Sequence, residues 1–184
     1  IYNVLPGTGA AVKRMSVADL KSLDVGSWFA PEYSNERIPT LREALELLKG
    51  KTKVIIEIKR GIGYYPGIVD KVLGNIKAMK LERDVTLVSF DLPTLYAARE
   101  KAKDISLGIV FDTATWEYIL KTSKILRSTS IFPNKELVTA GWVNKAHTMG
   151  LNLYPYTIDE EEDMLSMIRM GVDGIVTNRP DILF

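Results

Sequence analysis

Cysteine is absent from this sequence of 184 residues, and His147 is its only histidine. Without thiols the chain cannot form a disulfide, bind zinc through thiolates or use a cysteine nucleophile, and this composition fits a reducing compartment. No stretch approaches the length of about 18 consecutive apolar residues that a membrane-spanning helix needs. Residues 1–9 also lack the basic-then-apolar order of a signal peptide. We therefore expect a soluble, cytoplasmic protein that does not insert into a membrane.

An excess of charge of either sign is also missing, because 24 basic residues stand against 23 acidic ones. The protein therefore has no global positive field of the kind that draws proteins onto nucleic acid, and we expect no nucleic-acid partner. Any anion that it binds must be held locally by a few side chains. A chain of this length and ordinary composition can bury a substantial core as one domain.

The sequence does not start with methionine but opens on Ile1-Tyr2-Asn3. We expect from this that an N-terminal segment of the same protein is absent from the chain.

Two helix starts are marked by capping boxes, in which a Ser or Thr is followed three residues later by an acidic residue. The first is Ser16-Val-Ala-Asp19, before a short apolar stretch, and the second is Thr40-Leu-Arg-Glu43, before a longer amphipathic one. Gly50 supplies a stop for the second helix.

From residue 54 onward, short β-branched apolar runs alternate with stretches of helical periodicity. The pattern predicts strands at 54–58, 85–90, 107–111, 130–133, 153–157 and 174–177, with helices at 68–80, 92–103, 116–126, 138–149 and 160–170. Strict alternation predicts a parallel sheet covered by helices, which is either an open doubly wound sheet or a closed (β/α)8 barrel.

The choice between these two folds depends on chain length and on one glycine-rich turn. A barrel has eight strands and about 250 residues, so six strands in 184 residues fit a barrel without its first two. A doubly wound sheet usually has a glycine-rich phosphate turn after its first strand, and Arg60-Gly-Ile-Gly63 matches that pattern poorly. We predict that residues 1–184 form one α/β domain, a (β/α)8 TIM barrel whose first two strands are missing from the chain.

A single carboxylate, Glu57, interrupts the first of the apolar strands. Placing a carboxylate there costs several kcal/mol unless it is paired or bound to a cation. Lys59 lies two residues further on and therefore shares a strand face with Glu57. An ion pair with Lys59 and a bound metal ion are both possible explanations at this point.

Six motifs in one order along the chain resemble those of the glycerophosphodiester phosphodiesterases. They are Gly26-Ser-Trp-Phe29, Arg37-Ile-Pro-Thr-Leu41, Ile55-Ile-Glu-Ile-Lys59, Val88-Ser-Phe-Asp91, Tyr156-Thr-Ile-Asp159 and Gly171-Val-Asp-Gly-Ile-Val-Thr-Asn-Arg-Pro180. The resemblance implies that the stretch from Ile55 to Lys59 forms the third barrel strand and that residues 12–48 are a small helical insertion beside the barrel mouth. For Trp28 and Phe29 in this insertion, core packing is a simpler explanation than an apolar wall over the substrate.

The resemblance also implies an activity, the metal-dependent hydrolysis of glycerophosphodiesters to sn-glycerol 3-phosphate and an alcohol. In such enzymes three carboxylates hold a divalent cation, Mg²⁺ or Ca²⁺, and two histidines act as acid and base. The motifs that would carry both histidines and two of the carboxylates are expected upstream of Ile1. We therefore expect no catalytic residue in this chain and no activity of this chain alone. A catalytically inactive barrel remnant with a binding or structural role is the alternative.

Four residues are carried over from the family as candidate site residues. Glu57 is the expected metal ligand, Lys59 the expected phosphate-binding residue, and Phe90 and Tyr156 line the mouth beside the substrate. Tyr156 occupies a position where the family often has tryptophan. Ordinary packing at the barrel rim is an equally good explanation for both aromatic residues.

Three other features attract attention but have structural explanations. His147 lies near the expected C-terminal end of a helix, where a cation meets the negative end of the helix dipole, so we do not expect it to be catalytic. The acidic run from Asp159 to Asp163 lies where a helix begins, which favours carboxylates on structural grounds. Arg179 could face the mouth or lie on the surface, and the sequence does not decide between the two.

Overall fold

The computed structural model describes residues 12–183 and divides the chain into two compact units, Ile1–Lys49 and Gly50–Phe184. The division follows the end of the expected insertion at residue 48, whose position beside a barrel mouth stays a prediction. The described part of the first unit contains short helices and no strand. These elements are η1 (Val12–Arg14), α1 (Val17–Ser22), η2 (Pro31–Tyr33) and α2 (Leu41–Leu48).

Both capping boxes are confirmed in the first unit. The Asp19 amide donates to Ser16 Oγ over 3.1 Å, and the Thr40 amide donates to Glu43 Oε2 over 2.8 Å. Glu43 also pairs with Lys21 of α1, and this ion pair joins the two helices. The Lys21 ammonium and the amide and hydroxyl of Thr40 lower the pKa of Glu43 to about 2.

Three aromatic rings form a small cluster in the first unit. Trp28 and Phe29 lie edge to face at 5.9 Å between centroids, and Tyr33 packs on Phe29. The side chains of Trp28 and Phe29 are 74% and 71% exposed, so the expectation that they pack in a core is wrong. Gly26 permits the local turn, since a Cβ at this position would overlap the backbone of Tyr33.

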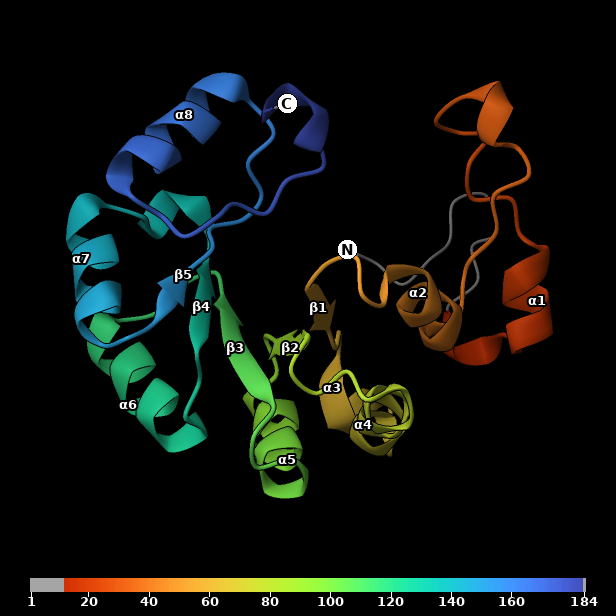
Figure 1. Cartoon of the computed structure of the whole chain (residues 1–184), viewed down its shortest axis with the longest axis horizontal. Coiled ribbons are helices and arrows are strands. Elements are labelled where there is room, and N and C mark those ends of the chain that lie inside the picture. The colour runs from red at the N-terminus through yellow and green to blue at the C-terminus, as the bar shows by residue number, and fades with distance from the viewer. Residues whose placement is uncertain (1–11, 184) are drawn as a thin grey trace. The chain divides into compact units, whose positions relative to one another are not determined.

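The second unit is built around five parallel strands in the order β1-β2-β3-β4-β5, with helices along the outer side of the curved sheet (Figure 1). The strands are β1 (Val54–Glu57), β2 (Val85–Ser89), β3 (Ser106–Phe111), β4 (Ser130–Pro133) and β5 (Asn152–Leu153). The helices are α3 (Gly61–Tyr64), α4 (Ile68–Met79), α5 (Leu92–Lys101), α6 (Trp116–Leu126), η3 (Lys135–Leu137), α7 (Ala140–Thr148), α8 (Glu161–Met170) and η4 (Pro180–Leu183). The expected α/β alternation is therefore confirmed.

The strand order distinguishes the predicted barrel from the doubly wound sheet that was its alternative. Each strand pairs with the next one in sequence, for example Glu57 with Val88 and Val88 with Gly108. A doubly wound sheet reverses direction part way and places consecutive strands out of order. The sequential order among the described strands is that of a β/α barrel.

The strand expected at residues 174–177 is not a regular strand. Its backbone nevertheless bonds to the chain after β5, because the Val176 amide donates to Pro155 O over 2.9 Å and the Ile158 amide donates to Val176 O over 2.9 Å. Pro155 has no N–H to offer a ladder, which accounts for the short β5 and for the irregular pairing beyond it.

The two faces of the sheet differ in what covers them. Side chains on the helix-covered face are almost entirely buried and aliphatic: Leu87, Leu107, Ile109, Ile131 and Leu153. On the opposite face Val88, Val110 and Phe132 form a smaller cluster, against which Tyr154 and Tyr156 pack. The Phe132 ring lies over Gly108, where a Cβ would be 2.5 Å from Phe132 Cε2. This cluster fills the middle of the inner face.

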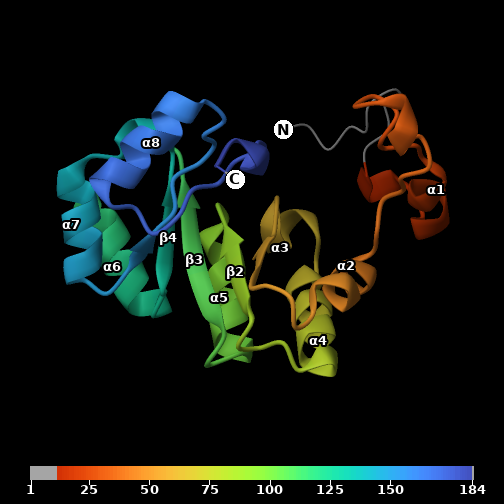
Figure 2. The same ribbon diagram turned by 45° about the horizontal axis from the view of Figure 1, so that its top comes forward.

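A pocket of about 320 Å³ lies at the N-terminal ends of the strands. Its lining includes Lys53, Arg83, Asp84, Ser106, Ser130 and Asn152. Lys53 Nζ forms an ion pair with Asp84 Oδ1 over 2.7 Å and thereby joins the segments that enter β1 and β2. Figure 2 shows the same strands from another angle, where β2, β3 and β4 lie side by side.

Candidate active site

Polar and aromatic side chains follow the C-terminal ends of the strands. Glu57 is the last residue of β1, Phe90 follows β2, Asp112 follows β3, and Asn134 follows β4. Tyr156 forms an isolated parallel bridge with Asn134. Parallel strands end at one edge of their sheet, and in β/α barrels that edge holds the chemistry. We call this edge the mouth.

Glu57 and Lys59 are ion-paired at the mouth, with 3.0 Å between Lys59 Nζ and Glu57 Oε2. Their side chains are 30% and 47% exposed, so both charged groups can reach a ligand from solution. The two residues belong to one chain segment, and the pair therefore joins no separate elements of the fold. An exposed ion pair of this kind adds little stability.

A second polar group at the mouth connects Tyr156, Asp112 and Asn134. The Tyr156 hydroxyl donates to Asp112 Oδ1 over 2.9 Å, and Asn134 Nδ2 donates to the same oxygen over 3.4 Å. Burial, the hydrogen bond to Asp112 and the charges of Asp112 and Glu57 raise the pKa of Tyr156. The phenol therefore stays protonated and holds its ring in one orientation. Phe90 packs edge to face on that ring, with 5.8 Å between centroids.

The position of Phe90 is fixed by its two neighbours in sequence. The buried Ser89 hydroxyl donates to Ile58 O over 2.6 Å and accepts from the Asp91 amide over 3.0 Å. Asp91 in turn caps α5 by accepting from the Thr94 amide over 3.0 Å. These bonds tie the ends of β1 and β2 to the start of α5, so that Phe90 projects from a fixed turn.

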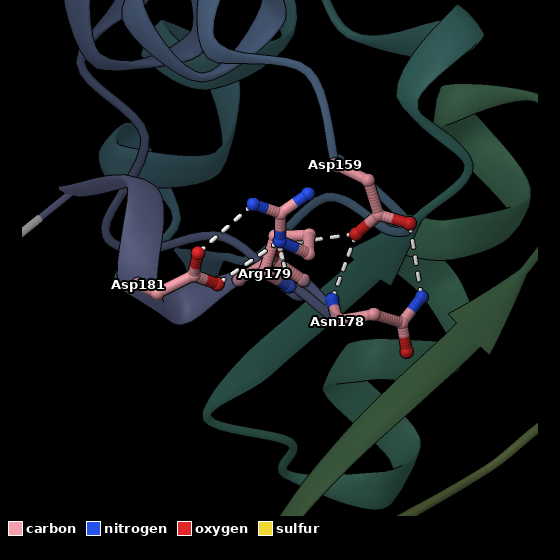
Figure 3. A network of polar contacts seen from close by, with 5 residues as sticks. Asp159, Asn178, Arg179 and Asp181 are labelled. Carbon is pink, nitrogen blue, oxygen red and sulfur yellow. Dashed lines mark hydrogen bonds and ion pairs between the residues drawn. The ribbon is translucent and has the colours of Figure 1, made fainter. Parts of the chain in front are cut away.

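Asp159 closes the loop after residue 176 (Figure 3). Its carboxylate accepts from the Asn178 amide over 2.7 Å, from Asn178 Nδ2 over 2.9 Å and from the Thr177 hydroxyl over 3.0 Å. Bonds from the backbone and side chain of Asn178 lower the pKa of Asp159. Arg179 points away to a two-contact ion pair with Asp181, and its side chain is 56% exposed, which is a surface position.

The acidic run is thus divided among different roles. Glu161, Glu162 and Asp163 lie in the first turn of α8 as expected, whereas Asp159 precedes the helix and serves the loop. Asp163 also receives an ion pair from Lys135 over 2.6 Å. His147 lies in the last turn of α7, with Nε2 3.0 Å from Asp173 Oδ2, and so takes part in a contact between that helix and the chain before residue 174.

Two mouth residues, Asp112 and Asn134, were not singled out from the sequence. Each directly follows an apolar strand run, Leu107–Phe111 or Ile131–Pro133, and a polar residue in that place marks the mouth of a β/α barrel. Among residues 12–183 no group of three His, Asp or Glu side chains could hold a metal ion. No helix in that part of the chain has the length and apolar character needed to cross a membrane.

The fold and the position of the site define a class, that of β/α barrel proteins with polar groups at the C-terminal ends of parallel strands. Solved structures support it. A putative glycerophosphodiester phosphodiesterase from Galdieria sulphuraria superposes with a TM-score of 0.85 at 22% identity, over 98% of this chain and 74% of that one. An Oleispira antarctica phosphodiesterase in complex with the product sn-glycerol-3-phosphate superposes with a TM-score of 0.80 at 21% identity, over 95% of this chain and 71% of that one.

Sequence comparison identifies the family. The model of the glycerophosphoryl diester phosphodiesterase family matches residues 2–182, and the chain belongs to this family. A glycerophosphodiester phosphodiesterase from Caldanaerobacter subterraneus is 34% identical over 94% of this chain and 71% of its own length. One from Bacillus subtilis is 28% identical over 93% of this chain and 64% of its own length. The resemblance drawn from the six motifs and the TIM-barrel fold class are confirmed.

Proposed function

We propose that the full-length protein hydrolyses glycerophosphodiesters to sn-glycerol 3-phosphate and an alcohol with the help of a divalent cation, Mg²⁺ or Ca²⁺, in the cytoplasm. The observation that carries the proposal is the Glu57–Lys59 pair at the mouth of a barrel of this family. The stability of the fold does not require the pair, since the pair joins no separate elements. A requirement of ligand binding explains it better.

Glu57 fits the role of one oxygen ligand to a hard cation. Its carboxylate is accessible at the mouth, and carboxylate oxygens are what Mg²⁺ and Ca²⁺ prefer. One carboxylate does not make a site, so the other ligands would come from outside residues 12–183, from the substrate phosphate or from water. A cation bound there would neutralise charge that develops on the phosphoryl oxygens.

The other mouth residues have separable tasks in this proposal. Lys59 binds a phosphate oxygen as a point charge, exchanging its contact with Glu57 for one with the substrate. Phe90 and Tyr156 present ring surface to the organic part of the diester. Asp112 and Asn134 hold Tyr156 in place through the hydrogen bonds described above.

A binding or structural role without catalysis is the second candidate, and one observation favours it. The single histidine of the chain pairs with Asp173 at the end of α7 and does not belong to the mouth. The described residues therefore offer no histidine for proton transfer to the leaving alcohol.

Direct assay separates the two candidates. Purified full-length protein is incubated with glycerophosphocholine and Mg²⁺ or Ca²⁺, and sn-glycerol 3-phosphate is measured by a coupled dehydrogenase. We expect turnover that EDTA abolishes and that added metal restores. Binding of the diester without release of product would support the non-catalytic role, and EDTA-resistant turnover would contradict the metal requirement.

A further inference from the structure

The negative charge of Asp112 is not neutralised within the described part of the chain. Its two hydrogen-bond donors, the Tyr156 hydroxyl and the Asn134 amide, are both uncharged and both contact Oδ1. No Lys or Arg among residues 12–183 forms an ion pair with Asp112, whereas Glu57 is paired with Lys59. Asp112 is exposed, and its Oδ2 accepts no hydrogen bond from these residues. The carboxylate can therefore meet a cation that arrives from solution.

This carboxylate contacts one member of an aromatic pair. Tyr156 is bonded to Asp112, and Phe90, which is 47% exposed, meets Tyr156 edge to face. The ring face carries partial negative charge and attracts cations, most strongly where water is partly excluded. A ring pair next to an unneutralised carboxylate favours an ammonium group over a neutral alcohol for two independent reasons.

We propose that Asp112, together with the rings of Phe90 and Tyr156, recognises an ammonium group on the alcohol part of the substrate and so makes the enzyme selective for cationic diesters. The proposal rests on the proposed function, because it assigns the alcohol side of the same site. The mouth is then divided by charge: Lys59 serves the anionic phosphate, and Asp112 serves the cationic alcohol. Diesters of choline or ethanolamine satisfy both parts, and diesters of glycerol or inositol satisfy only the first.

The kinetic test uses Asp112→Asn, which removes the charge but keeps an oxygen that accepts the Tyr156 hydrogen bond. Asp104→Asn is the matched control, because the same change is then made before β3 instead of after it. We expect Asp112→Asn to raise KM for glycerophosphocholine about tenfold, because one charge contact with the ammonium group is lost, and to leave kcat nearly unchanged. KM for glycerophosphoglycerol should stay the same, and Asp104→Asn should resemble the parent for both substrates.

A general disturbance of the mouth would affect both substrates alike. Equal losses in Asp112→Asn for the choline and glycerol diesters would therefore overturn the proposal, as would an unchanged preference for the choline diester. Tyr156→Phe keeps the ring and deletes the hydrogen bond. It should retain the preference for the choline diester if the charge and the rings carry recognition.

Binding without turnover provides a separate readout. Choline and its neutral tert-butyl isostere are titrated into the protein by calorimetry or ligand-observed NMR. We expect choline to bind more tightly than the isostere in the parent protein, and this difference to shrink in Asp112→Asn, where only the rings still favour the cation. If the parent hydrolyses no diester but still prefers choline, the proposed function fails and the ammonium site stands. If the parent hydrolyses diesters and binds both alcohols equally, the ammonium site fails alone.

Discussion

The two ends of the parallel sheet each carry a lysine–carboxylate ion pair, but the two pairs join different things. At the N-terminal end, Lys53 reaches Asp84 and also the Arg83 carbonyl, so that it connects the segments that enter β1 and β2. At the C-terminal end, Glu57 and Lys59 lie two residues apart on one segment. The first pair has a structural task, and the second has none that the fold reveals. The presence of an ion pair therefore does not identify a functional site. Whether the pair connects separate elements of the fold distinguishes a structural pair from a candidate functional one.

The two ends also differ in the charged and aromatic groups that they expose. At the mouth Phe90 and Tyr156 form a ring pair beside Asp112, and Val88, Val110 and Phe132 fill the inner face behind them. The pocket at the opposite end is lined by the charged side chains of Lys53, Arg83 and Asp84, and also by Phe132 from the back of the cluster. The apolar cluster of the inner face thus lies between a pocket that contains charged side chains and a mouth suited to an amphipathic ligand.

Exchanging one lysine at each end is the strongest test of this comparison. Lys59→Met keeps much of the aliphatic stem but deletes the cation that meets the phosphate, so we expect kcat/KM for glycerophosphocholine to fall by about 100-fold or more. Metal affinity should hold or rise, because a nearby positive charge disappears. Lys53→Met should leave kcat/KM within about twofold of the parent, since Lys53 lies at the opposite end of the sheet and its exposed ion pair adds little stability. Comparable losses in the two variants would remove the distinction between the ends.

The carboxylates of the two pairs give the second test. Glu57→Gln keeps the shape but removes a negative charge from the proposed metal site, so the Kd for Mg²⁺ or Ca²⁺ should rise by about ten- to a hundredfold, and added metal should partly restore the rate. Asp84→Asn should not change the Kd. Calorimetry measures both, and an unchanged Kd in Glu57→Gln would show that Glu57 is not a ligand.

Local signals in the sequence were sufficient for much of the fold. The boxes at Ser16 and Thr40 are confirmed because a capping box involves residues only three apart, and the strand–helix alternation follows from periodicity within each segment. The order of the strands could not be obtained in this way, because pairing is a long-range property. The end of the sheet was harder still, since Pro155 interrupts a ladder that the apolar run 153–157 otherwise indicates.

The candidate site was predictable only where a motif marked it. Glu57, Lys59, Phe90 and Tyr156 were all named, but Asp112 was not, because its bond to Tyr156 spans 44 residues. Asp159 was explained as a helix-start carboxylate, whereas its partners Thr177 and Asn178 lie 18 and 19 residues further on. Contacts of this kind arise when neighbouring strands end together, and no local pattern contains them.

The apolar cluster between the two ends is tested by a pair of glycine substitutions. A Cβ at Gly108 would lie 2.5 Å from Phe132 Cε2 and 2.8 Å from Ser130 Oγ, so Gly108→Ala should lower the free energy of unfolding by about 1–3 kcal/mol through overpacking. Gly74 lies inside α4, where a Cβ would have no neighbouring atom within 4 Å, so Gly74→Ala should raise that free energy by about 0.5–1 kcal/mol. Urea denaturation measures both. If both substitutions changed the free energy of unfolding by the same amount and in the same direction, the inner face would be loosely packed around Gly108.

The smallest expected effect concerns the loop that Asp159 holds beside the mouth. The pKa of Asp159 is lowered in the folded protein because the ionised carboxylate accepts bonds from Asn178 and Thr177. A group with a lowered pKa stabilises the fold at pH values above its ordinary pKa of about 3.9, and this contribution disappears as the pH falls through the lower folded value. Asp159→Asn removes the charge, so the variant should melt below the parent at pH 7, and the difference between the two Tm values should shrink steadily below pH 4. The low-pH measurement serves as the control, because the difference in charge between Asp and Asn disappears as the carboxylate of Asp159 becomes protonated. A Tm difference that stays constant from pH 7 to pH 2.5 would show that the shape of the side chain, and not its charge, holds the loop.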